Sequence, residues 1–260
     1  MKVELNQILQ DLNIPKTNAL VYFHISSDKL KEFFNIKDIL KGLDDYFDTS
    51  STYFLPSFTF SGAEYHKYLE ATPIFDIRKT PCKVNLISEI FRRNKDTIRS
   101  LHPWLSVAGK GTMAKEILHE QHKEIEIFGE KSPFYKIMQR DGYVVGLGVD
   151  CNTNSFAHLS DELMKDLYTF PVYEDKIYTT TCIDYKGVKQ IVKTTLLHKD
   201  ISKNIKPRKL KKLFNSQNFY REKKIHEINF YSLKIKDSVQ YIYSQCIEDV
   251  TLKGKPIYYE

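Results

Sequence analysis

The stretch ALVYFHI, residues 19–25, decides the fold class because it is a continuous apolar run of strand length. Such a run is typical of a strand that is buried on both faces, as in sheets covered by helices. The next segment, LKEFFNIKDILKGLDDYF at 30–47, has helical periodicity. TYFLPSFTF at 52–60 then predicts a second buried strand, interrupted at Pro56. This alternation of strand and helix predicts an α/β layer architecture.

The rest of the chain continues the alternation after an opening amphipathic helix that ends near Pro15. ATPIFDIRKTPCKV, residues 71–84, has two prolines and little periodicity, which predicts an ordered surface loop. Further helices are predicted at 84–93, 112–122, 156–168, 207–216 and 234–247. Further strands are predicted at 141–150, at 172–181 and 187–197 as an antiparallel pair, at 224–231 and near the end. No repeat or linker divides 1–260, so we expect a single domain with a basic, helix-containing C-terminal portion from about residue 203.

Composition excludes some classes of protein. The 260 residues are 42% hydrophobic and 13% aromatic, which favours a packed globular chain over a disordered one. The formal charge of +6 does not require nucleic acid and suits a phosphate-bearing partner such as a nucleotide or coenzyme equally well. Charges interrupt every apolar run near the N-terminus, so neither a signal peptide nor a membrane span is expected. The four cysteines include no CxxC pair, and a reduced cytoplasmic location is predicted.

Two short motifs give weak signals. Gly109-Lys110-Gly111-Thr112 lacks the GxxxxGK[ST] spacing of a phosphate-binding loop, so we interpret it as a turn into the next helix. HEQH at 119–122 has histidines three apart rather than the four of a zinc-binding HExxH helix. A solvated helix face is the better interpretation of HEQH.

The segment GLGVDCNTNSFAHLSDE, residues 146–162, is richer in chemistry. Two glycines relax the end of a predicted strand, Asp150 and Asn152 follow, and His158 begins a predicted helix. Ligands bind at such strand ends in α/β folds, where a histidine can act as a general base. Asp150 and Asn152 are equally typical of helix caps, and His158 of a structural residue. Cys151 has no assigned base and is interpreted as a small buried side chain.

Six segments in order give the chain its family resemblance. The first three are His24-Ile25-Ser26-Ser27, Leu55-Pro56-Ser57-Phe58-Thr59 and Phe75-Asp76-Ile77-Arg78-Lys79-Thr80-Pro81. The others are Arg99-Ser100-Leu101-His102-Pro103 with Ser106-Val107-Ala108, Phe128-Gly129-Glu130-Lys131-Ser132-Pro133, and Gly146-Leu147-Gly148-Val149-Asp150-Cys151-Asn152-Thr153 with His158 beyond it. Together, over about residues 20–200, they resemble the aminoglycoside 3-N-acetyltransferases, also called antibiotic N-acetyltransferases.

This resemblance implies a three-layer α/β/α fold with a mixed central sheet and transfer of an acetyl group from acetyl-CoA to an amine. It implies that His158 is the base, oriented by an acidic residue for which Asp200 stands at about the right place. No metal is implied. The residues that the resemblance implies for binding of the amine substrate are Glu130, Asp150, Asn152, His102 and Trp104. Binding of CoA falls to His24, Ser26, Ser27, Arg78, Arg99, Ser100, Ser106 and Val107.

The chemistry agrees with these roles. An alkylammonium of pKa ~10 must lose a proton before it attacks a thioester, and a neutral histidine held by a carboxylate can take that proton. Backbone amides or the Ser106 hydroxyl could stabilise the oxyanion. Acidic residues would attract a cationic amino sugar, and the basic excess would hold CoA phosphates.

Three departures from the family pattern bear on the substrate. Leu105 replaces the second histidine of HPTHS, the NTxxH spacing is stretched to NTNSFAH, and no acidic insertion follows the strand at 172–181. These features resemble family members that acylate a nucleotide-linked envelope amino sugar, so an envelope sugar and an aminoglycoside both remain candidates for the acceptor.

Two other functions remain open. One is a silent relative that binds CoA or a sugar without turnover. The less favoured one is a nucleic-acid-binding protein that uses the basic segment 203–224. The partners we expect are an amino-sugar substrate and CoA, without nucleic acid, and the oligomeric state is left open.

Overall fold

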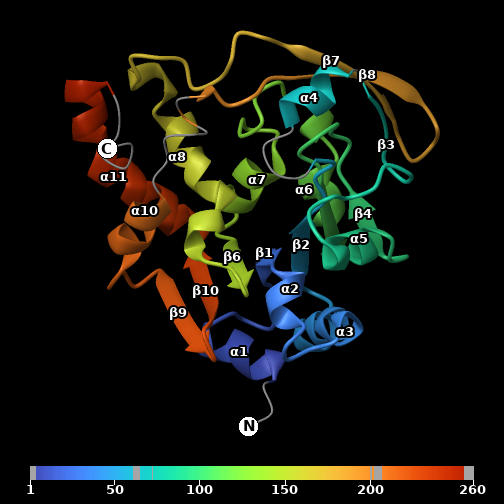
Figure 1. Ribbon diagram of the computed structural model, residues 1–260, viewed down its shortest axis with the longest axis vertical. Helices are drawn as coiled ribbons and strands as arrows, with labels where there is room; N and C mark the ends of the chain where they lie inside the picture. Colours follow the sequence, from blue (N-terminus) through green and yellow to red (C-terminus); the bar gives the residue numbers. More distant parts are fainter. Residues whose placement is uncertain (1–3, 61–64, 72, 200, 202–206, 255–260) are drawn as a thin grey trace.

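A seven-stranded mixed sheet organises the chain (Figure 1). The computed structural model describes residues 4–60, 65–71, 73–199, 201 and 207–254. The strand order is β4-β5-β2-β1-β6-β10-β9. The bounds are β4 Thr97–Arg99, β5 Val107–Gly111, β2 Thr52–Pro56, β1 Leu20–Ile25, β6 Tyr143–Leu147, β10 Ile228–Lys234 and β9 Tyr220–Ile225. β1 is parallel to both β2 and β6, and the outer pairs are antiparallel.

The central strand β1 explains how the layers form. All six of its residues are buried, and successive side chains point to opposite faces of the sheet. Leu20 and Tyr22 join one hydrophobic core, whereas Val21, Phe23 and Ile25 join the other. Helices therefore cover both faces, which confirms the α/β class expected from ALVYFHI.

Each face has its own set of helices. The core around Phe23 receives α1 Leu5–Asp11, α3 Ile36–Tyr46 and α5 Leu86–Arg92. The core around Tyr22 receives α6 Ala114–Leu118, α7 Pro133–Gln139, α8 His158–Leu163, α10 Pro207–Phe214 and α11 Ile235–Lys253. Short helices complete the set: α2 Ser27–Leu30, α4 Tyr65–Glu70, and the 3-10 turns η1 Gln121–Lys123, η2 Cys151–Thr153, η3 Ser155–Ala157 and η4 Lys165–Leu167.

A second, three-stranded sheet lies at the end of the molecule away from the N-terminus (Figure 1). It has the order β3-β7-β8, with β3 Ile74–Asp76, β7 Tyr178–Ile183 and β8 Lys189–Thr194. β7 and β8 are antiparallel as predicted, although they are shorter than the predicted strands. β3 lies inside the segment 71–84 that the sequence predicts to be loop. Its three residues pair with β7 about a hundred residues later, a contact that local pattern cannot reveal.

Three other local predictions are wrong. Gly109–Gly111 is not a turn but the end of β5, and Gly109 packs so closely against Phe54 that any Cβ would clash with that ring. The predicted strand at 224–231 is a hairpin, because His226 and Glu227 have positive φ and reverse the chain between β9 and β10. The predicted helix 156–168 is broken into η3, α8 and η4. The predicted last strand lies outside the described residues.

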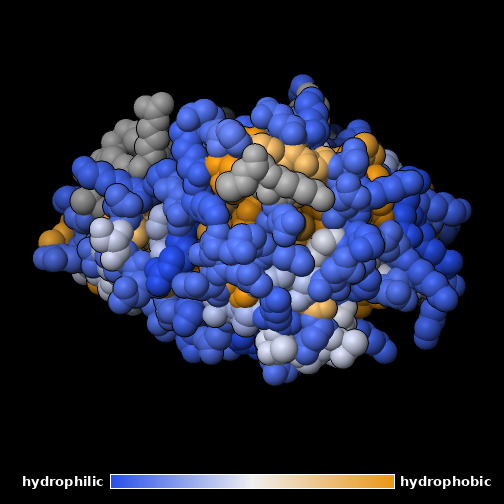
Figure 2. All heavy atoms as spheres, turned by 90° about the horizontal axis from the view of Figure 1, so that it is seen from below, coloured by the Kyte–Doolittle hydropathy of each residue, from blue (hydrophilic) through white to orange (hydrophobic). Residues whose placement is uncertain are grey.

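The face that contains α1 is mostly hydrophilic, with hydrophobic atoms visible near its centre (Figure 2). Within the described part of the chain, no helix combines the length and the apolar character needed to cross a membrane.

Candidate active site

The position of His158 is set by a chain of local caps after β6. The Asp150 side chain accepts a hydrogen bond from the Asn152 amide at 3.0 Å, and the Asn154 side chain accepts one from the Phe156 amide at 3.1 Å. These two bonds stabilise η2 and η3, and α8 begins directly after them at His158. Buried Phe156 anchors the turn, with its ring centroid 5.1 Å from that of Tyr22 on β1. Asp150 therefore caps η2, which helps to place His158 at a helix start, and contact of Asp150 with a substrate stays a prediction.

His158 is paired with a carboxylate from its own helix. Its Nδ1 lies 3.0 Å from Oδ2 of Asp161, whose side chain is fully buried. The other oxygen of Asp161 accepts a hydrogen bond of 2.6 Å from the Tyr168 hydroxyl. Residues three apart lie on the same helix face, so the HLSD spacing makes this pair possible. A carboxylate held from both sides fixes the imidazole with Nδ1 toward the protein, which leaves Nε2 as the nitrogen able to exchange a proton with a ligand.

His158 opens onto a cavity of about 230 Å³. Its ring lies 5.4 Å from the ring of Phe128, and Trp104 lines the same cavity. The structure thus brings together His158 and Trp104, which the sequence assigns to base and substrate binding. The remaining lining residues are Phe58, Phe60, Leu105, Ile127, Ser155 and Leu197. Most of this wall is aromatic or aliphatic, a surface on which the C–H face of a sugar ring can pack.

The segment between β4 and β5 is held by buried polar side chains. Arg99 is 3% exposed, and its guanidinium donates to Thr80 O, Ser57 O and Ser106 Oγ. Burial lowers the pKa of Arg99 to about 10. Ser100 Oγ accepts from the Val107 amide at 2.8 Å. Contact of these residues with CoA stays a prediction, and their geometry favours support of the loop.

Ser106 does not suit the predicted role of oxyanion donor. Its hydroxyl is fully buried, donates its single proton to Ser57 O at 2.6 Å and accepts from Arg99. Val107 is also fully buried, as part of β5.

His102 organises the loop that contains Trp104. It is 1% exposed, and its Nδ1 accepts a hydrogen bond from the Leu105 amide at 3.0 Å. The neutral tautomer therefore has its proton on Nε2, which lies 3.3 Å from Thr194 Oγ1. Thr194 also accepts from the indole N–H of Trp104 at 3.3 Å. Burial lowers the pKa of His102 to about 3, so it is neutral at pH 7 and positions Trp104 rather than lining the cavity itself.

Several buried polar atoms in and beyond the carboxyl ends of β1 and β6 have no hydrogen-bond partner among the described residues. These are Nε2 of His24, Oγ of Ser27 and Oδ1 of Asn152. Burial lowers the pKa of His24 to about 4. Since buried polar groups are nearly always satisfied, orphaned atoms at adjacent strand ends fit a site that binds a polar ligand. His24 and Ser27 are residues that the resemblance assigns to CoA, so the residues present fit that cosubstrate.

The other predicted site residues are more exposed. Ser26 caps α2 by accepting from the Lys29 amide. Arg78 is exposed on the loop after β3 and donates to Tyr185 O. Glu130 is exposed next to Gly129 and does not line the His158 cavity. Asp200 lies outside the described residues, so its pairing with His158 stays a prediction.

Sequence reasoning missed an acidic groove. Some of the residues that line this groove are close in sequence to residues that line the His158 cavity. The volume of the groove is about 380 Å³, and its walls include Ile125, next but one to Ile127, and Thr195, next but one to Leu197. Four carboxylates line it, and one lysine does so: Glu126, Asp166, Glu174, Asp175 and Lys165. Lys165 is bound by Glu126 at 2.7 Å and by Glu162 at 2.8 Å, which leaves the groove negative. The carboxylates come from separate segments, so no acidic insertion in the sequence signals them.

The structure of the described residues supports neither a nucleophilic role for Cys151 nor a metal site. Burial, followed by the charge of Asp150, raises the pKa of Cys151 to about 12, so a thiolate nucleophile is disfavoured. Among residues 4–60, 65–71, 73–199, 201 and 207–254, no group of three or more His, Cys, Asp or Glu could hold a metal ion.

Comparison with known proteins gives the family. The model of the aminoglycoside 3-N-acetyltransferase family matches residues 23–245, most of the chain. The chain belongs to the aminoglycoside 3-N-acetyltransferase family. Membership confirms, at the level of the family, the expected class of enzyme, an acyltransferase.

Relatives of this family agree in sequence and in fold. The SPbeta prophage-derived aminoglycoside N(3')-acetyltransferase-like protein YokD of Bacillus subtilis (strain 168) is 32% identical over 94 residues, which span 35% of this chain and 34% of YokD. The structure of a histidine-to-alanine variant of aminoglycoside acetyltransferase AAC(3)-IVa in complex with a gentamicin has a TM-score of 0.74 at 17% identity, over 96% of this chain and 91% of that one. AAC-IIIb in a binary complex with CoASH has a TM-score of 0.72 at 16% identity, over 92% and 93%. The expected α/β/α fold with a mixed sheet is thereby confirmed.

Proposed function

We propose that this protein is an acetyl-CoA-dependent N-acetyltransferase whose acceptor is a cationic amino sugar of the aminoglycoside type. The observation that carries the proposal is the His158–Asp161 pair, which faces an aromatic cavity in a chain of this family. A histidine held by a buried carboxylate and open to a cavity is the arrangement that a general base requires.

In the proposed reaction, Nε2 of His158 takes a proton from the acceptor amine as the amine nitrogen attacks the thioester carbonyl. Asp161 holds the ring and stabilises the imidazolium that forms. The C–S bond then breaks, and the imidazolium returns the proton to the departing sulfur, so the products are an amide and a thiol. Tyr168 restrains the second oxygen of Asp161. No acyl-enzyme is required, in agreement with the buried, protonated Cys151.

Asp161, rather than Asp200, is the carboxylate that we propose for orientation. It is placed at 3.0 Å from His158 by one turn of the same helix, and its burial keeps its hydrogen bonds away from water. CoA supplies the acetyl thioester when bound, and His24, Ser27 and Asn152 offer unsatisfied polar atoms toward it.

The acidic groove favours a polycationic acceptor. AAC(3)-IVa, similar in fold, was solved with a gentamicin. Here the carboxylates of Glu174, Asp175 and Asp166 would attract ammonium groups beyond the reacting amine and would repel the diphosphate of a nucleotide-linked sugar. This electrostatic preference ranks the aminoglycoside acceptor above the envelope sugar, despite Leu105 and the stretched NTNSFAH spacing.

A cytoplasmic location is part of this proposal. All four cysteines are buried and free, as is usual for chains kept in a reducing compartment.

The test is a thiol-release assay with acetyl-CoA against aminoglycosides and nucleotide-linked amino sugars. We expect kcat/KM to be highest for an aminoglycoside and to fall with added salt. Glu174→Gln should raise KM for that acceptor about three- to tenfold, because one partly buried charge contributes on the order of 1 kcal/mol. Glu227→Gln, in the β9–β10 turn and outside both cavities, is the matched control and should change nothing.

Two outcomes would change the assignment. Preference for nucleotide-linked sugars, unaffected by Glu174→Gln, would replace the aminoglycoside acceptor with an envelope sugar. CoA binding without thiol release on any amine would instead favour a silent relative.

A further inference from the structure

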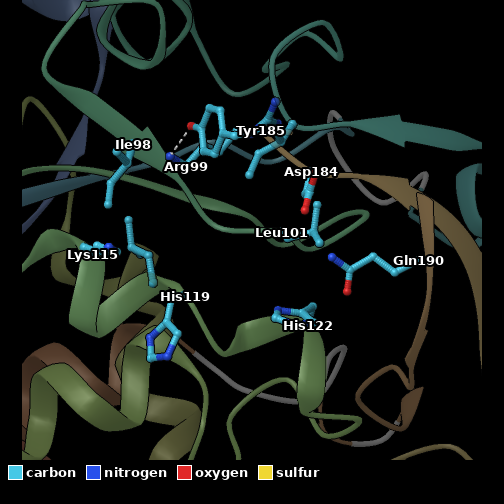
Figure 3. Close-up of a pocket in the computed structure, with 11 residues that line it drawn as sticks. Ile98, Arg99, Leu101, Lys115, His119, His122, Asp184, Tyr185 and Gln190 are labelled. Atoms are coloured by element: carbon cyan, nitrogen blue, oxygen red, sulfur yellow. Dashed lines mark hydrogen bonds between the residues drawn. The ribbon is translucent and has the colours of Figure 1, made fainter. Parts of the chain in front are cut away.

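A further cavity, of about 300 Å³, has Leu101 from the segment after β4 in its wall (Figure 3). Its walls come from α6, the turn η1, strand β4 and the β7–β8 hairpin. It shares no lining residue with the His158 cavity or with the acidic groove. We propose that this cavity binds a small amphipathic anion, with a carboxylate beside Lys115 and an apolar body of about two rings between α6 and β4.

The body of the proposed ligand follows from the apolar walls. Ile98, Leu101 and Leu118 line the cavity from β4, the loop after it and α6, and Ile77 and Tyr185 add to this surface. The Tyr185 hydroxyl accepts a hydrogen bond from the Arg99 amide at 2.7 Å, which fixes the ring at the mouth (Figure 3). An apolar cavity of about 150 Å³ holds one benzene ring, so about twice that volume accommodates two fused rings.

The charge of the proposed ligand follows from Lys115 on α6, which lines the cavity. Lys115 has no ion-pair partner among the described residues. Two carboxylates close to it in sequence are already engaged: Glu116 on α6 with Arg140, and Glu120 beyond the end of α6 with Lys136 at 3.1 Å. His119, the C-cap residue of α6, also lines the cavity, and its Nε2 lies 3.9 Å from Oε1 of Glu120. An incoming carboxylate would therefore meet Lys115 without displacing a carboxylate of the described residues.

The far side of the cavity supports the same orientation. Asp184, the acid among the lining residues, accepts from the amides of Lys186 and Val188 at 2.8 and 2.9 Å and so belongs to the hairpin turn. Buried Arg99 behind it bonds only to neutral oxygens. Nδ1 of His122 is buried and has no hydrogen-bond partner among the described residues, and the His122 ring lies opposite Gln190 (Figure 3). A polar substituent on the ligand can satisfy this nitrogen.

The experiment uses 2-naphthoate as the anionic probe and 2-naphthamide as its neutral match, titrated into the full chain by calorimetry. We expect a Kd of about 1 mM or tighter for 2-naphthoate, which about a dozen non-hydrogen atoms reach at ordinary ligand efficiency. Lys115→Ala should weaken 2-naphthoate about three- to tenfold and leave 2-naphthamide unchanged. Ala at this exposed helix position is compatible with folding. Gln190→Trp, which fills the cavity, should abolish binding of both probes.

Lys189→Ala is the matched control, because Lys189 is an exposed lysine next to Gln190 that does not line the cavity. It should bind both probes like the natural chain. Saturating CoA should leave 2-naphthoate bound, and its displacement would assign the probe to the CoA site and overturn the proposal. Equal affinity for the two probes, or unchanged affinity of the Lys115→Ala chain for 2-naphthoate, would refute the proposed contact between Lys115 and a carboxylate. No binding up to about 5 mM would remove the site. None of these outcomes depends on turnover, so the result is independent of the proposed acetyl transfer.

Discussion

Two histidines, His158 on α8 and His102 between β4 and β5, show how surroundings divide one residue type between two roles. His158 keeps 20% of its side chain exposed, pairs with a carboxylate and opens onto a cavity. His102 is 1% exposed, bonds only to neutral groups and has a pKa lowered by burial to about 3. A charged partner stabilises an imidazolium, whereas burial among neutral partners prevents one. His158 therefore has the partner and the access to a cavity that the proposed base needs, whereas His102 is restricted to holding a loop.

The largest test of this comparison is His158→Ala. We expect kcat on the best acceptor to fall about 10²- to 10⁴-fold, the usual contribution of a general base, with little change in the KM for acetyl-CoA. Thiol release and circular dichroism measure the two quantities that matter, turnover and fold. Full turnover in a folded variant would remove His158 from the chemistry.

The next test separates the two candidate carboxylates. Asp161→Asn keeps the volume of a buried side chain but removes its charge, and we expect kcat to fall about 10²- to 10³-fold. Tyr168→Phe keeps the carboxylate and should cost less than about tenfold, because it deletes one hydrogen bond. Asp200→Asn should leave kcat unchanged. If Asp200→Asn is the more damaging substitution, the orienting role belongs to Asp200.

His102→Ala should have the opposite effect from His158→Ala, because it should lower stability more than turnover. The substitution leaves the buried Leu105 amide without its acceptor and opens a void, so we expect the free energy of unfolding to fall by about 2–4 kcal/mol. Denaturant titration measures this loss. Turnover per folded molecule should fall less than about tenfold, and a loss equal to that of His158→Ala would make His102 part of the chemistry.

The smallest effect is a dependence of stability on pH. Burial lowers the pKa of His102 to about 3 and that of His24 to about 4, below the ordinary 6.5. The unfolded chain therefore binds more protons, so the stabilisation is complete above about pH 6.5 and is lost as the pH falls toward 4. From pH 7 to 5.5 we expect a loss of about 1–3 kcal/mol from the two groups together. His24→Leu should reduce this loss by about half, and an unchanged slope would show that His24 does not stay neutral in the folded chain.

The elements that the sequence predicts well are those whose signal is local. ALVYFHI is apolar throughout and forms the central strand, and the period of residues 36–46 matches the helix that covers it. The six family-like segments likewise led to His158 and Trp104, which share one cavity. Asp161 was missed although HLSD was visible. Asp161, Glu162 and Asp166 are all acidic residues shortly after His158, and the sequence does not distinguish them. Of the three, only Asp161 is fully buried and bonded to Tyr168.

The sequence by itself determined the alternation of buried strands and amphipathic helices and the family, because each depends on neighbouring residues. Tertiary structure alone decided which carboxylate faces His158, which buried polar groups hold the loop around His102, and where four separate carboxylates form one groove. The groove joins residues far apart in the chain. The His158–Asp161 and His102–Leu105 contacts each span three residues, but burial in the folded chain selects them, and burial acts through space rather than along the sequence. Only the folded chain separates a histidine able to exchange protons from one that holds a loop.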